Sequence, residues 1–379
     1  MLRHLSLLIF FAFGAARSVA EMPPSAWPTN GWPSSSPEAQ KMDSNALEAF
    51  DQEIFDGKYG YIDGLLVIRH GEVVFERSYK HDYQKLSVGK GTPGIYNYYD
   101  QSWHPFYKST DLHTMQSISK TVTSTLIGIA IRRGAIPGVD VKVMPYFAGF
   151  RTKPDSRRDS MTLAHVLTMT TGIAWDESSD TDLEAGEDWI QYVLDQPMVA
   201  KPGKVFVYNS GASELLSYIL EKATGKHADD YATEQLFRPL GIDTFYWKRT
   251  PKALTNTADG LYLRPRDLAK LGYLFLNDGV WDGKRLLPEG WVRDATARKV
   301  EKTDWNEFGY GYKWWVISQK SATSYDAYAA SGHGGQRLIV IPELEVIVTV
   351  TAWNIYDARE LAMETALERV LAAVQDCSR

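Results

Sequence analysis

The stretch MQSISKTVTSTLIGIAIRRG, residues 115–134, places a polar start in front of a long apolar pattern. Its apolar positions recur every three or four residues and share one helical face: Ile118, Val122, Leu126 and Ile129. Gly134 ends the run. Ser117 and Lys120 stand three positions apart in the first turns, so their side chains emerge on the same face. The stretch therefore predicts a helix that presents a Ser-x-x-Lys pair at its N-terminal end.

Ser-x-x-Lys alone is a weak pattern, and this chain holds a second copy from Ser87 to Lys90. That copy lies among glycines in KLSVGKGTPG (85–94), where no helix fixes the lysine. Ser117 instead has the free backbone N–H groups and the dipole of a helix N-terminus nearby, which suit an attacking alkoxide and an oxyanion hole. Without further evidence, a helix-start serine beside a solvated lysine is the simpler interpretation.

Outward from this helix, the pattern predicts strands toward both ends of the chain and helices between them. Two strand-like runs at 64–79 form a hairpin, and further runs lie at 309–318 and 337–353. Helical patterns are found at 37–54, 163–172, 188–196, 213–225, 228–241, 264–279 and 357–376. Because short turns join adjacent strands, we expect one antiparallel sheet. The fold class is α+β, a sheet domain of residues 41–114 and 246–379 flanked by helices, with a mostly helical lobe of residues 115–245 inserted.

The N-terminus indicates export. The run LSLLIFFAFGAA (5–16) is too short to span a bilayer, and SVA (18–20) predicts signal cleavage near Ala20. Residues 21–40 then form an extended leader that packs loosely on the main body. The one cysteine, Cys377, allows no internal disulfide, which fits a bacterial periplasm. We therefore expect a periplasmic or secreted protein without stable membrane insertion after signal removal; the alternative is that the run is retained as an uncleaved membrane anchor.

The charge of the chain bears on its partners. Its net charge of −6 becomes more negative when cleavage removes Arg3 and Arg17, which argues against nucleic acid as a partner. None of the eight histidines forms a close pair and there is no His-Glu-x-x-His, so we expect no metal site. No nucleotide loop is present, so no cofactor is expected, and the oligomeric state is not readable. No Gly-x-Ser-x-Gly elbow is found, which disfavours an α/β-hydrolase.

Two later stretches change the interpretation of Ser117. KPGKVFVYNSGASELLSYILEKATG (201–225) places Tyr208, Asn209 and Ser210 at the entrance to a helix. SGHGGQRLIVI (331–341) places a His-Gly-Gly triplet, residues 333–335, before a strand, where glycines let a substrate lie against the backbone. Each stretch has a plain alternative: Asn209 or Ser210 caps the helix, and the triplet is a loop.

Taken together, Ser-x-x-Lys, a Tyr-led tripeptide and a basic-x-Gly triplet in this order resemble the serine β-lactamase and penicillin-binding-protein superfamily. The resemblance extends over roughly 40–375. MTLAHVLTMTTGIAW (161–175) and GLYLRPRDLAKLGYLFLNDGVWDGKRLL (260–287) are similar to the class C-like branch, which includes esterases and 6-aminohexanoate-dimer hydrolases. The fold expected from the resemblance is the β-lactamase/transpeptidase-like one.

The resemblance implies roles for the residues of the three motifs. Ser117 would be the nucleophile, and Lys120 with Tyr208 would transfer protons. The backbone N–H groups of Ser117 and Gln336 would form the oxyanion hole, and His333, Gly334, Gly335, Asn209 and Ser210 would contact a small ester or amide substrate. For lysine to act as a base at pH 7, its pKa must fall from about 10.4 toward 7, which a buried cleft can cause.

Two departures from the superfamily pattern bear on the substrate. The Tyr motif is usually Tyr-x-Asn, whereas here Ser210 takes the third place. His333 stands where β-lactamases usually carry lysine. Both changes favour an esterase or a linear-amide hydrolase over a β-lactamase. The alternatives are β-lactamase or D-alanyl peptidase activity at the same site, or a non-catalytic cell-wall or β-lactam-binding protein.

Overall fold

The fold is described from a computed structural model, which describes residues 27–86, 107–301, 303, 308–318, 325–355 and 359–375. The signal sequence, the Ser87–Lys90 copy and Cys377 lie outside these residues. The helices are α1 (Ser44–Phe55), α2 (Tyr83–Leu86), α3 (Ile118–Arg132), α4 (Ser156–Asp159), α5 (Leu163–Leu167), α6 (Ser179–Ala185), α7 (Trp189–Asp195), α8 (Ser210–Thr224), α9 (Ala228–Ala232), α10 (Arg238–Leu240), α11 (Pro265–Leu276), α12 (Trp291–Ala295) and α13 (Met363–Ala372). The strands are β1 (Ile62–Arg69), β2 (Glu72–Ser78), β3 (His113–Thr114), β4 (Tyr246–Trp247), β5 (Leu261–Leu263), β6 (Val280–Trp281), β7 (Lys284–Arg285), β8 (Gly309–Tyr310), β9 (Trp315–Ile317), β10 (Ala327–Gly332), β11 (Gln336–Ile341) and β12 (Val346–Ala352).

A seven-stranded antiparallel sheet joins the two ends of the chain. Its order is β2-β1-β12-β11-β10-β9-β8, so the N-terminal hairpin pairs with the last strand, β12. Within this pairing Leu65 lies opposite Val350 and Val67 opposite Val348. The α+β class and the antiparallel sheet built from both ends are therefore confirmed.

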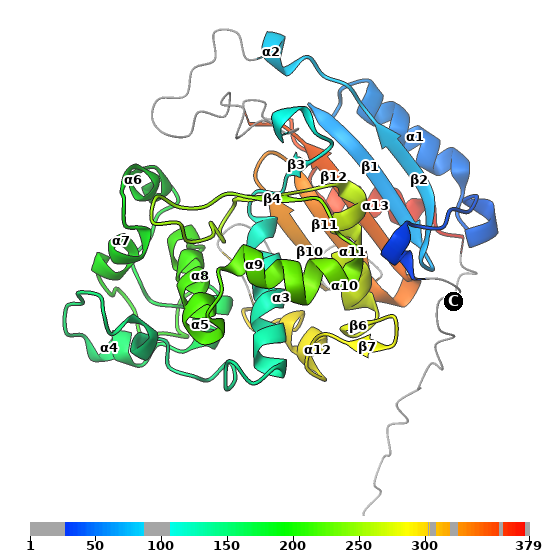
Figure 1. The fold of residues 1–379 in the computed structure, drawn as a ribbon. Coiled ribbons are helices and arrows are strands. Elements are labelled where there is room, and N and C mark those ends of the chain that lie inside the picture. The colour runs from blue at the N-terminus through cyan, green and yellow to red at the C-terminus, as the bar shows by residue number, and fades with distance from the viewer. Residues whose placement is uncertain are drawn as a thin grey trace, which may run out of the picture.

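The two faces of the sheet carry separate apolar cores. Because side chains alternate along a strand, Leu65 and Val67 face one core while Leu66 and Ile68 face the other. The first core is closed by α1 and α13, which pack together on one side of the sheet in Figure 1. The second core is shared with α3, α8 and α11, and it continues into the helical lobe.

The helical lobe comprises α4 to α9 and lies beside the sheet in Figure 1. Helix α3 connects the two parts, because it packs against α8 and α9 on one side and against β10 and β11 on the other. This placement brings the N-terminal end of α3 to the boundary between sheet and lobe. Residues from both parts can therefore reach Ser117.

Several element boundaries differ from the sequence prediction, each for a local reason. Strand β10 was not expected, because its sequence AYAASG is rich in small residues and lacks β-branched ones. The expected strand 309–318 is broken into β8 and β9, where Lys313 adopts a φ of 63°. The expected helix 163–172 ends at Leu167, two residues before Met169 with a φ of 58°. The helix expected at 37–54 begins only at Ser44, with Asp43 as its N-cap. Of the helix expected at 357–376, the structure shows α13.

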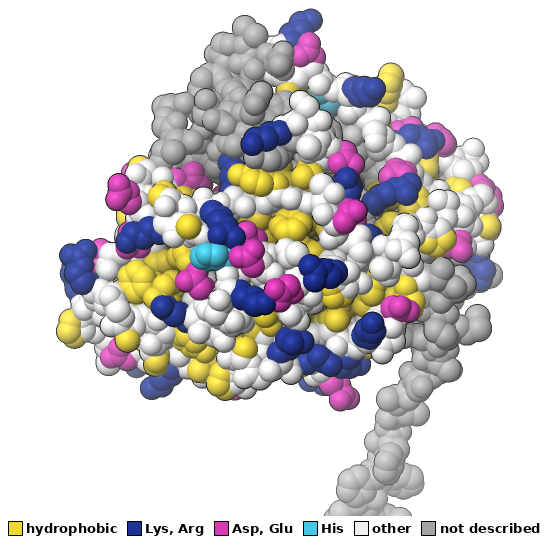
Figure 2. All heavy atoms as spheres, in the orientation of Figure 1, with side chains coloured by type: hydrophobic (Ala, Val, Ile, Leu, Met, Phe, Trp, Pro, Cys, Tyr) yellow, Lys and Arg dark blue, Asp and Glu magenta, His cyan; other side chains and the backbone are white. Residues whose placement is uncertain are grey.

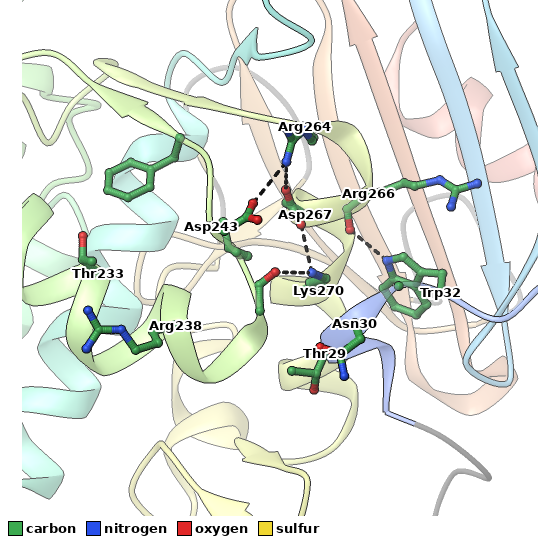
Figure 3. Close-up of a pocket in the computed structure, with 14 residues that line it drawn as sticks. Thr29, Asn30, Trp32, Thr233, Arg238, Asp243, Arg264, Arg266, Asp267 and Lys270 are labelled. Atoms are coloured by element: carbon green, nitrogen blue, oxygen red, sulfur yellow. Dashed lines mark hydrogen bonds and ion pairs between the residues drawn. The ribbon is translucent and has the colours of Figure 1, made fainter.

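The described part of the leader packs more closely than expected. Trp32 is buried, its indole Nε1 donates to the carbonyl of Arg266 at 2.9 Å, and its ring contacts Tyr273 edge-on. Residues 29–32 form one wall of a polar hollow of about 730 Å³, whose other walls come from α10 and α11 (Figure 3). Ion pairs from Arg264 and Lys270 to Asp267 run along the α11 wall of this hollow.

Candidate active site

The nucleophile candidate stands on a strained turn that the sequence did not reveal. Gln116, just before Ser117, adopts a left-handed φ of 49°, a conformation that costs about 1–2 kcal/mol in a non-glycine residue. Ser117 is the N-cap residue of α3, yet its side chain makes no capping hydrogen bond. Instead its Oγ accepts a hydrogen bond from Nζ of Lys120 at 2.9 Å. The serine hydroxyl is therefore partly exposed and held by the lysine rather than by its own helix.

Lys120 is buried, with only 1% of its surface exposed. Besides Ser117 Oγ, its Nζ donates to the carbonyl oxygen of Ala258 at 3.0 Å, and it lies 5.2 Å from the ring centroid of Tyr208. A solvated lysine beside a helix-start serine, the simpler interpretation of the sequence, does not describe this arrangement. The structure brings Ser117, Lys120 and Tyr208 together.

Tyr208 enters the site from the loop before α8. Its ring stacks on that of Trp315 on β9, with centroids 6.0 Å apart and planes inclined by 13°. Hydrogen bonds with Ser117 and Lys120 favour the ionised form of its hydroxyl. A residue of the lobe is thus oriented by a residue of the sheet.

The pKa of Lys120 is shifted upward, whereas a lysine that acts as a base at pH 7 would need a lowered pKa. Burial lowers the pKa of Lys120, but negative charge on Tyr208, Glu177, Asp259 and Asp180 outweighs burial, so the net shift is upward. Burial raises the pKa of Tyr208, and the positive charge of Lys120 opposes only part of that rise. Both groups therefore keep their protons in the resting site at pH 7.

The other two residues of the Tyr-led tripeptide serve the start of α8. Asn209 is fully buried, and its Oδ1 accepts from the backbone N–H of Ala212 at 2.6 Å. Ser210 donates from its Oγ to Glu177 at 3.0 Å, and Glu177 also accepts from the backbone N–H of Ser210 at 3.2 Å. The capping alternative therefore describes Asn209. Sequence reasoning missed Glu177, which lies 33 positions away with no motif around it.

The turn between β10 and β11 lies against the nucleophile turn. A Cβ added at Gly332 would come within 2.4 Å of the carbonyl oxygen of Met115, so only glycine allows this approach. Gly332 pairs with Gln336 across the turn, while Gly334 and Gly335 both adopt positive φ. This contact places the turn beside Ser117, on the side opposite the lobe.

Gln336 and His333 of this turn differ in environment. The side-chain amide of Gln336 is buried and pairs with both the N–H and the carbonyl of Ala352 on β12. These two hydrogen bonds tie the turn to β12, so the side chain of Gln336 has a structural role. His333 is exposed as a whole, yet desolvation of its ring lowers its pKa, so the imidazole is neutral at pH 7.

Two described hollows and the surface charge can be compared with the position of Ser117, Lys120 and Tyr208. The hollow of Figure 3 and a second one of about 630 Å³ beside β1 and β2 include none of Ser117, Lys120 and Tyr208 among their lining residues. Figure 2 shows basic and acidic side chains interspersed over the face that it displays. Among the described residues, no three His, Cys, Asp or Glu side chains gather as metal ligands would, and no helix is both long and apolar enough to cross a membrane.

Comparison with known proteins identifies relatives over most of the chain. The family described as Beta-lactamase matches residues 60–371. A 6-aminohexanoate-dimer hydrolase of Paenarthrobacter ureafaciens is 26% identical over 303 residues, which cover 72% of this chain and 73% of that protein. Penicillin-binding protein 4 of Amycolatopsis lactamdurans is 23% identical over 270 residues, covering 62% and 70% of the two chains.

A solved structure shows the same fold. A putative 6-aminohexanoate-dimer hydrolase from Bacillus anthracis superimposes with a TM-score of 0.67 at 20% identity, covering 85% of this chain and 81% of the other.

Proposed function

Because this chain belongs to the Beta-lactamase family and is a serine hydrolase, we propose that it cleaves an ester or amide bond through an acyl-enzyme on Ser117. The observation that carries the proposal is the 2.9 Å hydrogen bond between Lys120 Nζ and Ser117 Oγ, with the Tyr208 ring beside the same ammonium. A nucleophile and a proton-transfer group within hydrogen-bond reach are what acyl transfer requires.

The chemical steps follow from this geometry. Ser117 Oγ attacks the substrate carbonyl carbon, and its proton passes to the Lys120–Tyr208 pair. Backbone N–H groups of Ser117 and Gln336 would hold the oxyanion that forms. The same pair then gives the proton to the leaving alcohol or amine, which departs as the acyl-enzyme forms. Water attacks that ester in the second half of the reaction, and Ser117 regains its proton.

The protonation of the pair sets the condition for turnover. In the resting site the tyrosine is neutral and the lysine is an ammonium, so neither group can accept the proton of Ser117. The reactive form has lost one proton from the pair, which leaves a phenolate beside an ammonium or a neutral amine beside a phenol. Because the two groups interact strongly, the loss belongs to the pair and not to either residue.

The surroundings of the site favour an ester or linear amide as substrate over a β-lactam. At the third place of the Tyr-led tripeptide, Ser210 is engaged by the carboxylate of Glu177, so no side-chain amide is offered there. Neutral His333 offers no fixed positive charge for a substrate carboxylate, and Glu177 would repel one. The relationship to a 6-aminohexanoate-dimer hydrolase supports the same substrate class.

The location is a separate proposal that rests on the apolar run at 5–16 and the small residues before Glu21. We propose that the mature protein is periplasmic or secreted. N-terminal sequencing of protein from a bacterial host should begin at Glu21 in the exported fraction. A full-length chain retained inside the cell would contradict this proposal.

The activity is tested by covalent labelling. Wild type and Ser117→Ala are exposed to a fluorophosphonate, in which the serine oxygen displaces fluoride from phosphorus, and intact mass and peptide maps are recorded. We expect one adduct, on Ser117, and none in the variant. Ser119→Ala, which removes a neighbouring hydroxyl on the same helix, serves as a control and should still be labelled at Ser117.

Turnover then separates the substrate classes. We expect steady hydrolysis of short-chain nitrophenyl esters or linear amides and slower attack on penicillins. A penicillin adduct that forms and persists without turnover would instead support the binding-protein alternative. No adduct on Ser117, or one elsewhere, would overturn the proposed function.

A further inference from the structure

Glu214 is a buried carboxylate beneath the site that no sequence motif includes. It lies on α8 with 1% of its surface exposed. Its Oε1 accepts from the backbone N–H of Ala258 at 2.7 Å, and its Oε2 accepts from that of Thr257 at 3.2 Å. A buried carboxylate is unfavourable unless such donors satisfy it, so both oxygens are committed to this one stretch of backbone.

The clamped backbone is the one that holds the lysine. The carbonyl of Ala258 accepts the hydrogen bond from Lys120 Nζ at 3.0 Å, and the same Nζ donates to Ser117 Oγ. Thr257 adds a hydrogen bond from its Oγ1 to the carbonyl of Ser213, next to Glu214 on α8. The chain of contacts therefore runs from Glu214 through the backbone of Ala258 to the ammonium beside the nucleophile.

We propose that Glu214 is a positioning residue, which fixes Ala258 so that its carbonyl holds Lys120 Nζ against Ser117 Oγ and which makes this placement depend on pH. The inference rests on the proposed function, because it concerns how the same serine is activated. The hydrogen bonds of the Glu214 carboxylate go to the backbone of Thr257 and Ala258 and not to Ser117.

The pH dependence follows from what the carboxylate must accept. When ionised, Glu214 offers an acceptor oxygen to each of the two N–H groups, whereas protonation turns one oxygen into a hydroxyl. Burial and the neighbouring carboxylate of Asp259 raise the pKa of Glu214 to about 8, against the lowering by the two N–H groups and the charge of Lys120. The clamp is therefore complete above about pH 8 and loosens as pH falls.

Glu214→Gln tests the proposal, because the amide keeps the shape but turns an NH₂ group toward one of the two backbone N–H groups. Above pH 8, where the wild-type carboxylate is ionised, we expect kcat for a nitrophenyl ester to fall about tenfold to a hundredfold with KM little changed, as a displaced catalytic group produces. In wild type the profile of kcat against pH should contain a step near pH 8 that the variant lacks. Glu234→Gln, which removes an exposed carboxylate from the same lobe, is the matched control and should keep the wild-type profile.

The outcomes distinguish this inference from the proposed function. Wild-type labelling on Ser117 together with an unchanged kcat and pH profile in Glu214→Gln would overturn the positioning role alone. Failure of wild type to label would overturn the proposed function and the inference with it.

A variant that does not fold still leaves a test in wild type. The rate of Ser117 phosphonylation should then show one ionisation near pH 8, from Glu214, in addition to the rise at higher pH that comes from the Lys120–Tyr208 pair. A profile without the ionisation near pH 8 would overturn the inference.

Discussion

Two lysines are buried in the interior near Ser117, and their surroundings shift their pKa values in opposite directions. Lys120 on α3 is 1% exposed and Lys313, before β9, is 2% exposed. The Nζ of Lys120 lies among groups that can carry negative charge, which raise its pKa. The Nζ of Lys313 contacts the hydroxyl of Ser213 and the sulfur of Met169, both at 3.1 Å.

The difference shows that burial does not decide the charge of a lysine in this interior. Burial acts downward on the pKa of both ammonium groups. For Lys313 nothing outweighs burial, and the charge of Lys120 adds to it, so its pKa falls well below the usual value. For Lys120, Tyr208 and three carboxylates reverse the direction. The pKa values of the two buried lysines are therefore shifted in opposite directions, upward for Lys120 beside Ser117 and downward for Lys313.

Lys120→Met should give the largest effect. The substitution removes the donor to Ser117 Oγ and the charge that favours a Tyr208 phenolate, so kcat for a nitrophenyl ester should fall by about 10³-fold or more. Steady-state kinetics measure the loss, and circular dichroism checks the fold. A loss of less than tenfold in a folded variant would mean that Lys120 is not part of the proton-transfer pair.

Tyr208→Phe should give the next largest effect. The ring and its stacking on Trp315 remain, so only the hydroxyl is lost, and kcat should fall by about 10²-fold. The melting temperature should stay within a few degrees of wild type, which separates this result from unfolding. Wild-type turnover in Tyr208→Phe would leave Lys120 alone as the proton carrier.

The pH profile sharpens the comparison between the lysines. Since the pKa values of both Lys120 and Tyr208 are raised, the resting pair is protonated at neutral pH, and the reactive form appears as one proton is lost. We expect kcat/KM to rise with pH, by up to about tenfold per unit, until the pair titrates. A profile flat from pH 6 to pH 10 would show that the pair is already deprotonated at pH 6.

The sequence predicted that Ser117, Lys120 and Tyr208 would lie together, but it did not predict their pKa shifts. Apolar periodicity predicts the helix after Ser117, and the order of the three motifs indicates that they meet at the boundary between the sheet and the helical lobe. The direction of the lysine pKa depends on Glu177, Asp180 and Asp259, which approach only through tertiary packing and carry no local pattern. Glu214 escaped notice for the same reason, since a glutamate on an amphipathic helix is ordinarily exposed.

The fold shows the same division between local and distant causes. The hairpin β1–β2 and the strands β11 and β12 follow from runs of β-branched residues that the sequence displays directly. Strand β10 does not, because its sequence AYAASG contains no β-branched residue, and its Gly332 is required by the close approach of the Met115 carbonyl. A glycine that is required because a side chain would clash adds nothing to a hydrophobic pattern, so the sequence pattern does not reveal such a strand.

Lys313→Met should give the smallest effect on activity and thereby completes the comparison. The amino group of Lys313 touches neither Ser117 nor Tyr208 in the described contacts, so kcat should stay within about threefold of wild type. Methionine has a similar length and no proton to bind. Ser213 loses one hydrogen bond but still donates from its Oγ to the carbonyl of Asn209.

The stability of Lys313→Met should depend on pH in a defined direction. In wild type the unfolded chain binds a proton at Lys313 below about pH 10.4, whereas the folded chain does not, so wild-type stability falls as pH is lowered toward the depressed folded pKa. The variant does not lose stability in this way. The difference in melting temperature, variant minus wild type, should therefore be larger at pH 7 than at pH 10. Equal differences at the two pH values would show that Lys313 is charged in the folded protein and that the contrast with Lys120 is one of position only.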